Sequence, residues 1–547
     1  MNAAALASLP LLSLLIALPL LGALLMLVWP GEPSPNRLRG GAIVSLLLQL
    51  LVSALVLLLF DPDQAGLQLR ERQAWLPGIG LNYWLGVDGL SLPLVLINGA
   101  LTLVSVVCTR ELSRRPRLYF ALLLLISAAV NGAFLADNLL LFFLFYELEL
   151  IPLWLLISVW GGANRAYAAT KFLIFTAVSG MLILGAFLGL ALFTGTVDFS
   201  LTPVTSERLA MGSQLLLLGA LLVGFGIKMP LVPFHTWLPD AHTQASTPVS
   251  VLLAGVLLKL GTYGLLRFGL GLFPEAWARL APALAIWAAV SVLFGSLAAI
   301  AQRDMKRMVA YSSVGHMGTI LLAAAAASPV ALLGAQFQMV SHGLISALLF
   351  LLVGIVYRKT GTRDLDVLHG LLNPQRGLPL TGSLMVLGVM ASAGLPGMAG
   401  FIAEFLVFRG SLQAFPLATL LCIVGSGLTA VYFLLLVNRA FFGRLAITPH
   451  TDPARDGRLD VQLHSVAPRE TLPALALAIA VVALGLLPAP LGRITEATST
   501  AMAQLPLLLA SGGSGGGGWA DAGGSRRSGA LRADAAGRGA GRHPAGR

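Results

Sequence analysis

The chain has 547 residues, of which 57% are hydrophobic and only 11% are charged, and its formal net charge is +11. Soluble domains carry roughly 25% charged residues, so this composition excludes an ordinary soluble protein and indicates a membrane protein with many spans. A positive charge of this size can also indicate a nucleic-acid-binding surface. Here the basic residues lie mostly in short loops between apolar runs, as membrane topology requires. We therefore expect the lipid bilayer, and no nucleic acid, as a partner.

Apolar runs long enough to cross a bilayer predict an all-α, polytopic membrane protein with about 14 transmembrane helices. The first run is interpreted as a span because it is longer than the apolar core of a signal peptide and no basic residue precedes it. The predicted spans are 9–29, 41–60, 88–108, 117–136, 138–160, 168–194, 213–230, 247–270, 281–302, 308–327, 331–357, 379–411, 417–442 and 471–490.

Helix-breaking residues interrupt the seventh and the twelfth predicted spans. The seventh span ends at Pro230, and the twelfth contains Gly394 and Pro396 within the run ASAGLPGMAGFIAEF. Proline removes a backbone donor, and broken backbone is tolerated at membrane depth only where protein buries it or water reaches it. Interrupted helices at corresponding positions of two halves indicate an inverted-repeat transporter. Because these breaks are five spans apart, we expect two inverted five-helix repeats with helices 7 and 12 broken.

The repeats divide the chain into parts of different character. These are an N-terminal three-helix segment (1–116), the first repeat with helices 4–8 (117–272), the second repeat with helices 9–13 (273–445), a loop with the last helix (446–510) and a tail (511–547). The tail is rich in Gly and Arg, has almost nothing to bury and is predicted to be disordered.

The distribution of basic residues between the spans predicts the orientation of the chain. If the N-terminus is outside, most loop Arg and Lys residues are inside, as the positive-inside rule requires. The outer loops then hold only Arg70, Arg72, Arg208, Arg267, Arg279 and Arg409. This bias favours an even number of spans with both chain ends on the outer side.

Four charged residues fall deep within apolar runs: Glu147, Lys228, Lys259 and Glu404. An ammonium near the bilayer centre costs roughly 2.5–3.5 kcal/mol, and such residues commonly mark ion pathways. The alternative is that they form structural ion pairs between helices. Glu149 is two positions from Glu147 and points to another helix face, and for it a packing role has equal weight with a functional one.

Histidines lie between these charged spans. His316 and His342 are each in the middle of a span, with hydroxyl residues close by. Because histidine titrates near neutral pH, we expect them to relay protons, although a buried histidine can also be a satisfied packing partner. His235 and His242 lie in the segment after the seventh span, and Lys171, near the end of its span, is expected to reach toward the membrane surface.

Several cofactor signatures are missing from the sequence. No GxGxxG motif follows a strand, and no glycine-rich phosphate loop ends in GK[ST]. Cys108 and Cys422 are far apart in apolar runs, so they predict neither a disulfide nor a thiolate-held iron–sulfur cluster. We therefore expect no cofactor and no metal in this chain.

Five segments together resemble a known family. The segments are YELELIPLWLLISVWGG, KMPLVPFHTWLPDAHTQASTPVSVLLAGVLLKLGTYGLLRF, RDMKRMVAYSSVGHMG, SHGLISALLFLLVG and GLPGMAGFIAEF. They resemble the antiporter-like membrane subunits of complex I, specifically subunit M, which is chain 4 of the cyanobacterial and chloroplast NAD(P)H-quinone oxidoreductase. The resemblance covers about Leu81 to Phe442. The sequences of these motifs are closer to those of cyanobacterial members, and one region resembles the chain 4 variant that is used in CO2-uptake complexes.

The resemblance implies a proton path through this chain. The residues that match the family's pattern are Glu147, Lys228, Lys259, His316, His342 and Glu404. The position of Glu404 is glutamate in subunit M and lysine in the sister subunits L and N, which favours subunit M. In the implied mechanism Glu147 and Lys228 form a switchable pair. Protons then pass along Lys259, His316 and His342, and Glu404 passes them toward the outer side.

The function implied is that of a redox-inactive, proton-translocating membrane subunit of a type I NAD(P)H or ferredoxin:quinone oxidoreductase, which is a translocase. Its partners would be other membrane subunits, and its location the thylakoid membrane if the source is cyanobacterial, otherwise a bacterial inner membrane. The alternatives are a subunit of a multisubunit Na+/H+ antiporter or of a membrane-bound hydrogenase. A purely structural anchor is disfavoured, because buried charges beside broken helices are costly.

Overall fold

The computed structural model describes residues 9–109, 114–197, 199–200, 209–447, 463 and 466–510. In this part of the chain, 12 helices are long and apolar enough to cross a membrane, and Leu92–Cys108 and Pro379–Ser392 are shorter apolar helices. Together these account for the predicted number of spans, and the all-α, multi-pass architecture is confirmed. The tail at 511–547, predicted to be disordered, lies outside the described residues, and the predicted domain boundaries stay predictions.

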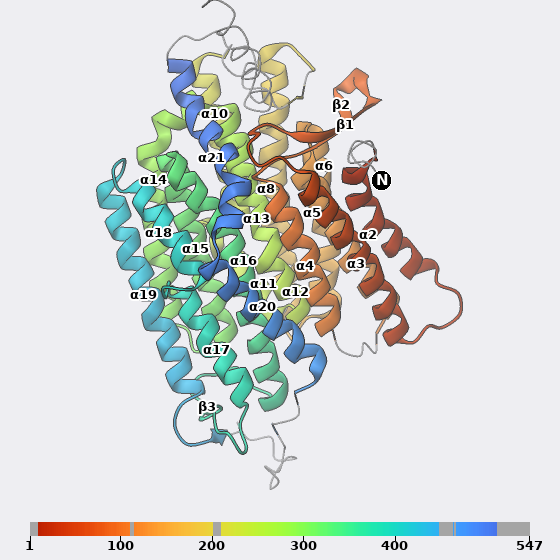
Figure 1. Cartoon of the computed structure of the whole chain (residues 1–547), viewed down its shortest axis with the longest axis vertical. Coiled ribbons are helices and arrows are strands. Elements are labelled where there is room, and N and C mark those ends of the chain that lie inside the picture. The colour runs from red at the N-terminus through yellow and green to blue at the C-terminus, as the bar shows by residue number, and fades with distance from the viewer. Residues whose placement is uncertain are drawn as a thin grey trace, which may run out of the picture.

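The helices form one upright bundle with a small sheet at each end (Figure 1). Strands β1 (Gln68–Leu76) and β2 (Leu81–Val87) pair at what we call the hairpin end, and β3 (Leu368–His369) pairs with β4 (Ala446–Ile447) at the β3 end. The uninterrupted long helices are α2 (Leu11–Val28), α3 (Pro35–Leu59), α4 (Leu92–Cys108), α5 (Pro116–Leu135), α8 (Arg165–Thr194), α14 (Pro274–Ile300), α15 (Met305–Ala326), α16 (Pro329–Thr360) and α19 (Pro416–Ala440).

Short polar side chains set the starts of several helices. Asp304 accepts hydrogen bonds from the backbone of Lys306 and Arg307 at the start of α15, and Ser328 accepts one from Ala331 at the start of α16. Each cap satisfies a donor that the first helical turn leaves free. Beyond the caps the long helices are predominantly apolar, as expected where one face meets protein and the other meets lipid.

The breaks predicted in the seventh and twelfth spans are confirmed. Helix α10 (Met211–Lys228) is followed by a 3-10 turn η2 (Phe234–Thr236) and the short helix α11 (Trp237–Gln244). Helices α17 (Pro379–Ser392) and α18 (Ala399–Ser411) are separated by a loop in which Gly394 and Gly397 have positive φ angles of +74° and +89°. Glycine is needed at such positions, because a Cβ atom disfavours this backbone conformation.

Two further spans, the fifth and the eighth, are irregular, although both were predicted as continuous helices. The fifth consists of α6 (Leu139–Leu148) and α7 (Leu150–Trp160), which meet at Glu149. Pro152 explains this break, because a proline ring clashes with the carbonyl four residues earlier, here that of Leu148. The eighth span consists of α12 (Thr247–Leu252), a π-helical segment η3 (Leu253–Leu257), α13 (Leu258–Gly264) and a second π-helical segment η4 (Leu265–Leu270).

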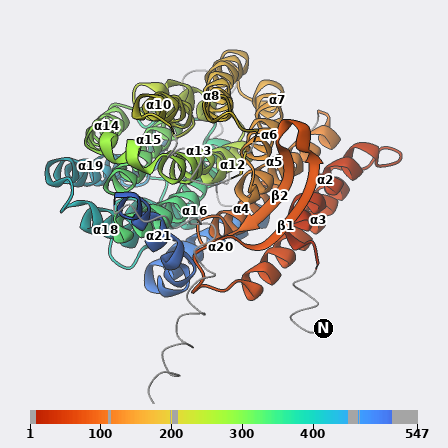
Figure 2. The same cartoon turned by 90° about the horizontal axis from the view of Figure 1, so that it is seen from above.

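The last span is longer and more bent than the single helix predicted at 471–490. Helix α20 (Pro468–Leu486) runs obliquely up from the β3 end, and α21 (Ala489–Ala510) continues to the hairpin end (Figure 1). The sequence signal was missed because α21 carries Arg493, Glu496 and several threonines among its apolar residues. Viewed from above, α2 and α19 lie at opposite edges of the bundle, and α12, α13 and α16 lie between them (Figure 2).

Candidate proton path

Lys259, on α13, is fully buried and contacts a histidine on the neighbouring helix. Its Nζ atom lies 2.8 Å from Nδ1 of His342 on α16, and it donates a hydrogen bond of 2.6 Å to the carbonyl oxygen of Ala254 in η3. π-Helical segments are rare and frequently occur at functional sites. Among the described residues no carboxylate pairs with Lys259, so its proton has only neutral neighbours.

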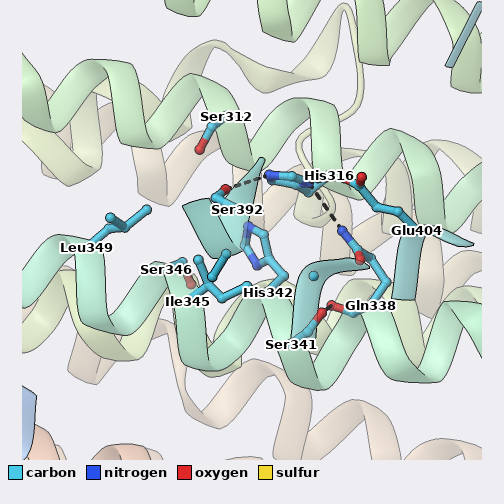
Figure 3. A pocket seen from close by; sticks show the side chains of 12 residues that line it. Ser312, His316, Gln338, Ser341, His342, Ile345, Ser346, Leu349, Ser392 and Glu404 are labelled. Carbon is cyan, nitrogen blue, oxygen red and sulfur yellow. Dashed lines mark hydrogen bonds and ion pairs between the residues drawn. The ribbon is translucent and has the colours of Figure 1, made fainter. Parts of the chain in front are cut away.

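His316, on α15, continues this contact toward α18. The rings of His316 and His342 lie 5.5 Å apart, edge to face. Nε2 of His316 is 3.1 Å from the hydroxyl oxygen of Ser392, and Nδ1 is 3.2 Å from the amide nitrogen of Gln338 (Figure 3). If Nδ1 accepts a hydrogen bond from that amide, Nε2 carries the ring proton and donates a hydrogen bond to the hydroxyl of Ser392.

Glu404, on α18, lies at the far side of this group. Its Oε1 atom is 3.7 Å from Nδ1 of His316, and its Oε2 atom accepts a hydrogen bond of 2.6 Å from the hydroxyl of Ser426 on α19. The break in the twelfth span makes this position possible, since a Cβ atom on Gly394 would lie 2.8 Å from Oε2. The carboxyl group therefore depends on a glycine in a positive-φ turn.

A small polar cavity lies among these side chains (Figure 3). Its volume is about 10 Å³, close to the roughly 10–15 Å³ that one water molecule needs. It is lined by Ser312, His316, Gln338, Ser341, His342, Ile345, Ser346, Leu349, Ala391, Ser392, Gly400 and Glu404. A single water here would have the several polar partners that an ordered internal water requires.

Lys228, the last residue of α10, pairs with Glu149 and not with Glu147, which corrects the predicted pairing. The ion pair joins Nζ of Lys228 to Oε1 of Glu149, and the two side chains are 3% and 0% exposed. Nζ also lies 4.8 Å from the ring centre of Tyr146, within reach of a cation–π interaction. The pairing was mispredicted because the sequence does not show which face of the fifth span meets α10, and it is Glu149 that lies on the enclosed face.

Glu147 lies closer to the outside of the bundle. It is partly exposed and packs against Gly180 on α8, where a Cβ atom would overlap its carboxylate. The same face of the helix carries Leu144, Leu148 and Ile151, which are 43%, 41% and 54% exposed. The two carboxylates near Lys228 therefore differ in surroundings: one is enclosed, and the other borders the bundle surface.

No hydrogen bond or ion pair in the described part of the chain joins Lys228 to Lys259. The link between them is the eighth span: a Cβ atom on Gly261 would lie 3.1 Å from Cβ of Lys228. The structure thus brings Lys259, His342, His316 and Glu404 into one contiguous group, and keeps Glu149 with Lys228 in a second group against the same helix.

The other charged residues singled out from the sequence have structural partners or are isolated. Lys171, expected to reach toward the membrane surface, pairs with Asp240 at 2.7 Å. His242 is fully buried and stacks on Phe350 with ring centres 4.3 Å apart, and His235 is buried beside Phe294 with ring centres 4.9 Å apart. Gln338, Ser392 and Ser426 were not predicted, and only their place near the histidines and Glu404 in the fold distinguishes them from other polar residues.

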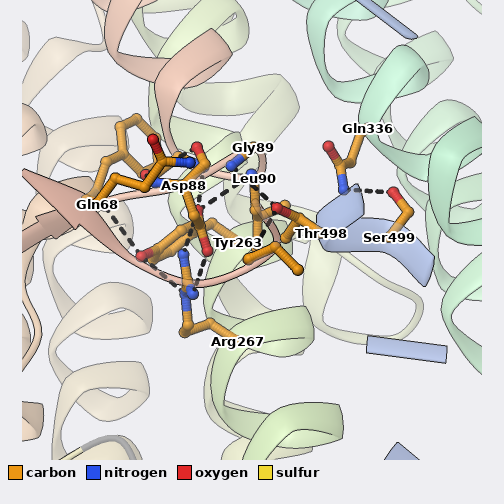
Figure 4. A network of polar contacts seen from close by, with 12 residues as sticks. Gln68, Asp88, Gly89, Leu90, Tyr263, Arg267, Gln336, Thr498 and Ser499 are labelled. Atoms are coloured by element: carbon orange, nitrogen blue, oxygen red, sulfur yellow. Dashed lines mark hydrogen bonds and ion pairs between the residues drawn. The ribbon is translucent and has the colours of Figure 1, made fainter. Parts of the chain in front are cut away.

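Arg267, counted among the outer-loop cations, is instead fully buried in η4. Its Nη1 and Nη2 atoms each lie 2.8 Å from a carboxylate oxygen of Asp88, and its Nε donates to the hydroxyl of Tyr263 at 3.0 Å (Figure 4). Beside this pair, the backbone N–H of Gly89 donates to the hydroxyl of Thr498 on α21 at 3.1 Å. These contacts hold the hairpin end of the eighth span against the segment after β2. They also connect that segment to α21.

Comparison with known proteins decides the family. Residues 136–429 match the family described as NADH:quinone oxidoreductase/Mrp antiporter, TM. NAD(P)H-quinone oxidoreductase chain 4 1 of Synechococcus sp. (strain JA-2-3B'a(2-13)) is 42% identical over 92% of this chain and 94% of that protein. The chain belongs to this family. Chain 4 2 of Thermosynechococcus vestitus is 40% identical over 90% of this chain and 92% of that protein.

Solved structures agree with the family assignment. A chain of respiratory complex I from Thermus thermophilus with bound NADH has a TM-score of 0.78 and 28% identity, covering 90% of this chain and 99% of that chain. A chain of the Mrp complex from Dietzia sp. DQ12-45-1b has a TM-score of 0.77 at 24% identity, covering 92% and 99%, and shares the fold. The resemblance to subunit M, or chain 4, is confirmed, whereas the CO2-uptake variant stays a prediction.

Proposed function

We propose that this antiporter-like chain translocates protons within a type I NAD(P)H or ferredoxin:quinone oxidoreductase through Lys259, His342, His316 and Glu404. The observation that supports this proposal most directly is their contiguity. Four titratable side chains from four different helices meet inside the bundle, and a cavity of about one water molecule is lined by three of them, His342, His316 and Glu404. Ionisable groups gathered in this way inside a membrane protein are typical of proton relays.

The geometry supports a stepwise transfer from α13 to α18. The ammonium of Lys259 can donate to Nδ1 of neutral His342 over 2.8 Å. From His342 a proton can reach His316 through the water-sized cavity, and from His316 it can reach Glu404 over 3.7 Å. Release at Glu404 is assisted by Ser426, which holds the carboxylate.

Energy for the transfer must come from outside this chain. Moving one elementary charge against 100 mV requires about 2.3 kcal/mol, and the proposal includes no redox centre in this chain. Its two cysteines, Cys108 and Cys422, are free, buried and on different spans. Electron transfer would therefore take place in other subunits of the complex, and its energy would reach Lys228 and Lys259 as shifts in the positions of charges.

The relatives favour an NAD(P)H-quinone oxidoreductase, over an Na+/H+ antiporter or a membrane-bound hydrogenase, as the complex that contains this chain. Those with 40% or more identity over most of the chain are named chain 4 of NAD(P)H-quinone oxidoreductase, from cyanobacteria. We extend this to the chain itself: its partners would be neighbouring antiporter-like membrane subunits, its location the thylakoid membrane, and the electron acceptor of the whole complex plastoquinone. An Mrp-type antiporter shares the fold, and nothing in the site favours sodium over protons.

The test is to replace Lys259 with alanine in the assembled complex and to measure protons translocated per electron. The expected result is loss of translocation through this subunit with quinone reduction retained. Lys171→Ala is the matched control, because it also removes a lysine, but one that pairs with Asp240 outside the group. An unchanged proton-to-electron ratio in Lys259→Ala, at equal amounts of assembled complex, would refute the proposal.

A further inference from the structure

Two carboxylates, Glu149 and Glu147, act on Lys228, and their surroundings differ. Glu149 holds the ion pair through Oε1, while its Oε2 atom is buried and has no hydrogen-bond partner among the described residues. A buried carboxylate oxygen without a partner is costly. That cost falls if the oxygen carries a proton or binds a water for part of the time.

Glu147 is the second carboxylate. It lies one helical residue beyond Tyr146, whose ring Lys228 contacts, and Lys228 and Glu149 are the charged groups that act on it electrostatically. Its surroundings are the partly exposed apolar face of α6 and the backbone of Gly180. A proton from outside this bundle would therefore reach Glu147 before it could reach Glu149.

The charges of the three residues favour one shared proton. With both carboxylates ionised and Lys228 protonated, the group would carry a net negative charge inside the membrane. Like charges in close proximity disfavour double ionisation, and one of the pair then holds a proton. One additional proton makes the group neutral overall, and this proton can be on either carboxylate.

We propose that Glu149 is a proton acceptor of this chain and that Lys228 transfers protons to it from Glu147. In the transfer, an N–H bond of the Lys228 ammonium breaks and an O–H bond forms on Glu149. The neutral amine then takes the proton of the Glu147 carboxyl group, which becomes a carboxylate. One proton has moved from the bundle surface to the core, and the total charge is unchanged.

The two carboxylates lie on different sides of the fifth span. Glu149 keeps a helical backbone with φ −75° and ψ −20°, and residues two apart on a helix point about 200° away from each other. Glu149 therefore lies on the enclosed side and holds the ion pair with Lys228, while Glu147 lies against Gly180 on α8. The inference rests on the proposed function, since it places a step before Lys259 in the same path.

The experiment compares Glu149→Gln, Glu149→Asp and Glu147→Gln in the assembled complex, with Glu275→Gln in the first turn of α14 as a carboxylate control away from the path. Protons translocated per electron are measured at equal amounts of complex. We expect loss of translocation in Glu149→Gln and in Glu147→Gln, partial recovery in Glu149→Asp, and normal values in Glu275→Gln. Normal translocation in Glu149→Gln would overturn the inference.

Assembly separates a structural role from proton transfer. Removing one partner of a buried ion pair leaves an uncompensated charge and can prevent folding. If Glu149→Gln does not assemble, Glu149→Asp decides the question, because it keeps the charge and shortens the reach. Reduced translocation per assembled complex supports transfer, and normal translocation overturns it. A defect in Lys259→Ala together with a normal Glu149→Gln would retain the proposed function and reject this inference alone.

Discussion

At the scale of single residues, Lys228, Glu404 and Lys259 each have two partners, but the partners differ in kind. Lys228 has a carboxylate and an aromatic ring, and Glu404 has a hydroxyl and a histidine. Lys259 has a histidine nitrogen and a backbone carbonyl. Because a buried charge without a counter-charge is costly, Lys259 is the lysine whose proton is held least strongly, since no carboxylate in the described part of the chain pairs with it.

Replacing Glu404 with glutamine tests the end of the group. Glutamine keeps the size of the side chain and can still accept from Ser426, but it cannot take up a proton. We expect protons per electron to fall while assembly and quinone reduction are partly retained. The measurement is translocation normalised to assembled complex. An unchanged proton-to-electron ratio would make Glu404 a structural residue.

At the scale of helices, each buried charge lies at or next to an interruption. Glu149 lies between α6 and α7, Lys228 ends α10, and Lys259 follows the π-helical segment η3. Glu404 follows the loop between α17 and α18. Irregular backbone offers free carbonyl and N–H groups where a regular helix would have none, and it is tolerated in a membrane only where protein or water satisfies it.

Replacing Gly394 with alanine tests the loop before Glu404. Its φ angle is +74°, and an added Cβ atom would lie 2.8 Å from the carboxylate of Glu404. The left-handed conformation costs a non-glycine residue about 1–2 kcal/mol, so the complex should melt at a lower temperature and translocate less. Gly427→Ala is the control, because a Cβ atom there has open space in helix α19. Equal melting temperatures in the two variants would contradict the prediction.

Replacing Pro152 with alanine tests the interruption of the fifth span. Alanine restores the N–H that α7 lacks and removes the ring that excludes a hydrogen bond to Leu148, so α6 and α7 should join into one helix. Because Glu149 already has helical φ and ψ angles of −75° and −20°, its ion pair with Lys228 should be kept, and translocation per assembled complex should stay normal. Pro282→Ala in α14 is the control, since that proline also lies inside a helix. Loss of translocation in an assembled Pro152→Ala complex, with normal values in Pro282→Ala, would contradict this and show that the break is needed.

These interruptions also mark the limit of what the sequence could predict. Proline and glycine signalled the breaks in the seventh and twelfth spans, and the buried charges indicated Lys259, His316, His342 and Glu404 from residue type alone. Pro152 carried a signal for the fifth break, but it was taken as part of a continuous span. The partner of Lys228 was mispredicted because the sequence does not show which face of the fifth span meets α10. The π-helical segments contain no residue type that requires them. Their register is decided by packing inside the bundle, which one sequence does not show.

At the scale of the whole molecule, the buried pair of Asp88 and Arg267 joins parts of the chain that are far apart in sequence. It connects the segment after β2 to the eighth span. The hydroxyl of Thr498 accepts a hydrogen bond from the backbone of Gly89, which connects α21 to the same segment (Figure 4). Charge counts assigned Arg267 to a loop because a cation near the end of an apolar run is commonly exposed. Its partner is 179 positions away, beyond the reach of any local pattern.

The orientation of the bundle gives the last prediction. Basic residues predict that the β3 end faces the inner side and the hairpin end the outer side. A cysteine placed at Arg115, which is exposed, should react with a membrane-impermeant thiol reagent only from the inner side. One placed at Trp75 in the hairpin, which is 54% exposed, should react only from the outer side. The native Cys108 and Cys422 are buried and give no background. Labelling of position 115 from the outer side, or of position 75 from the inner side, would contradict the orientation.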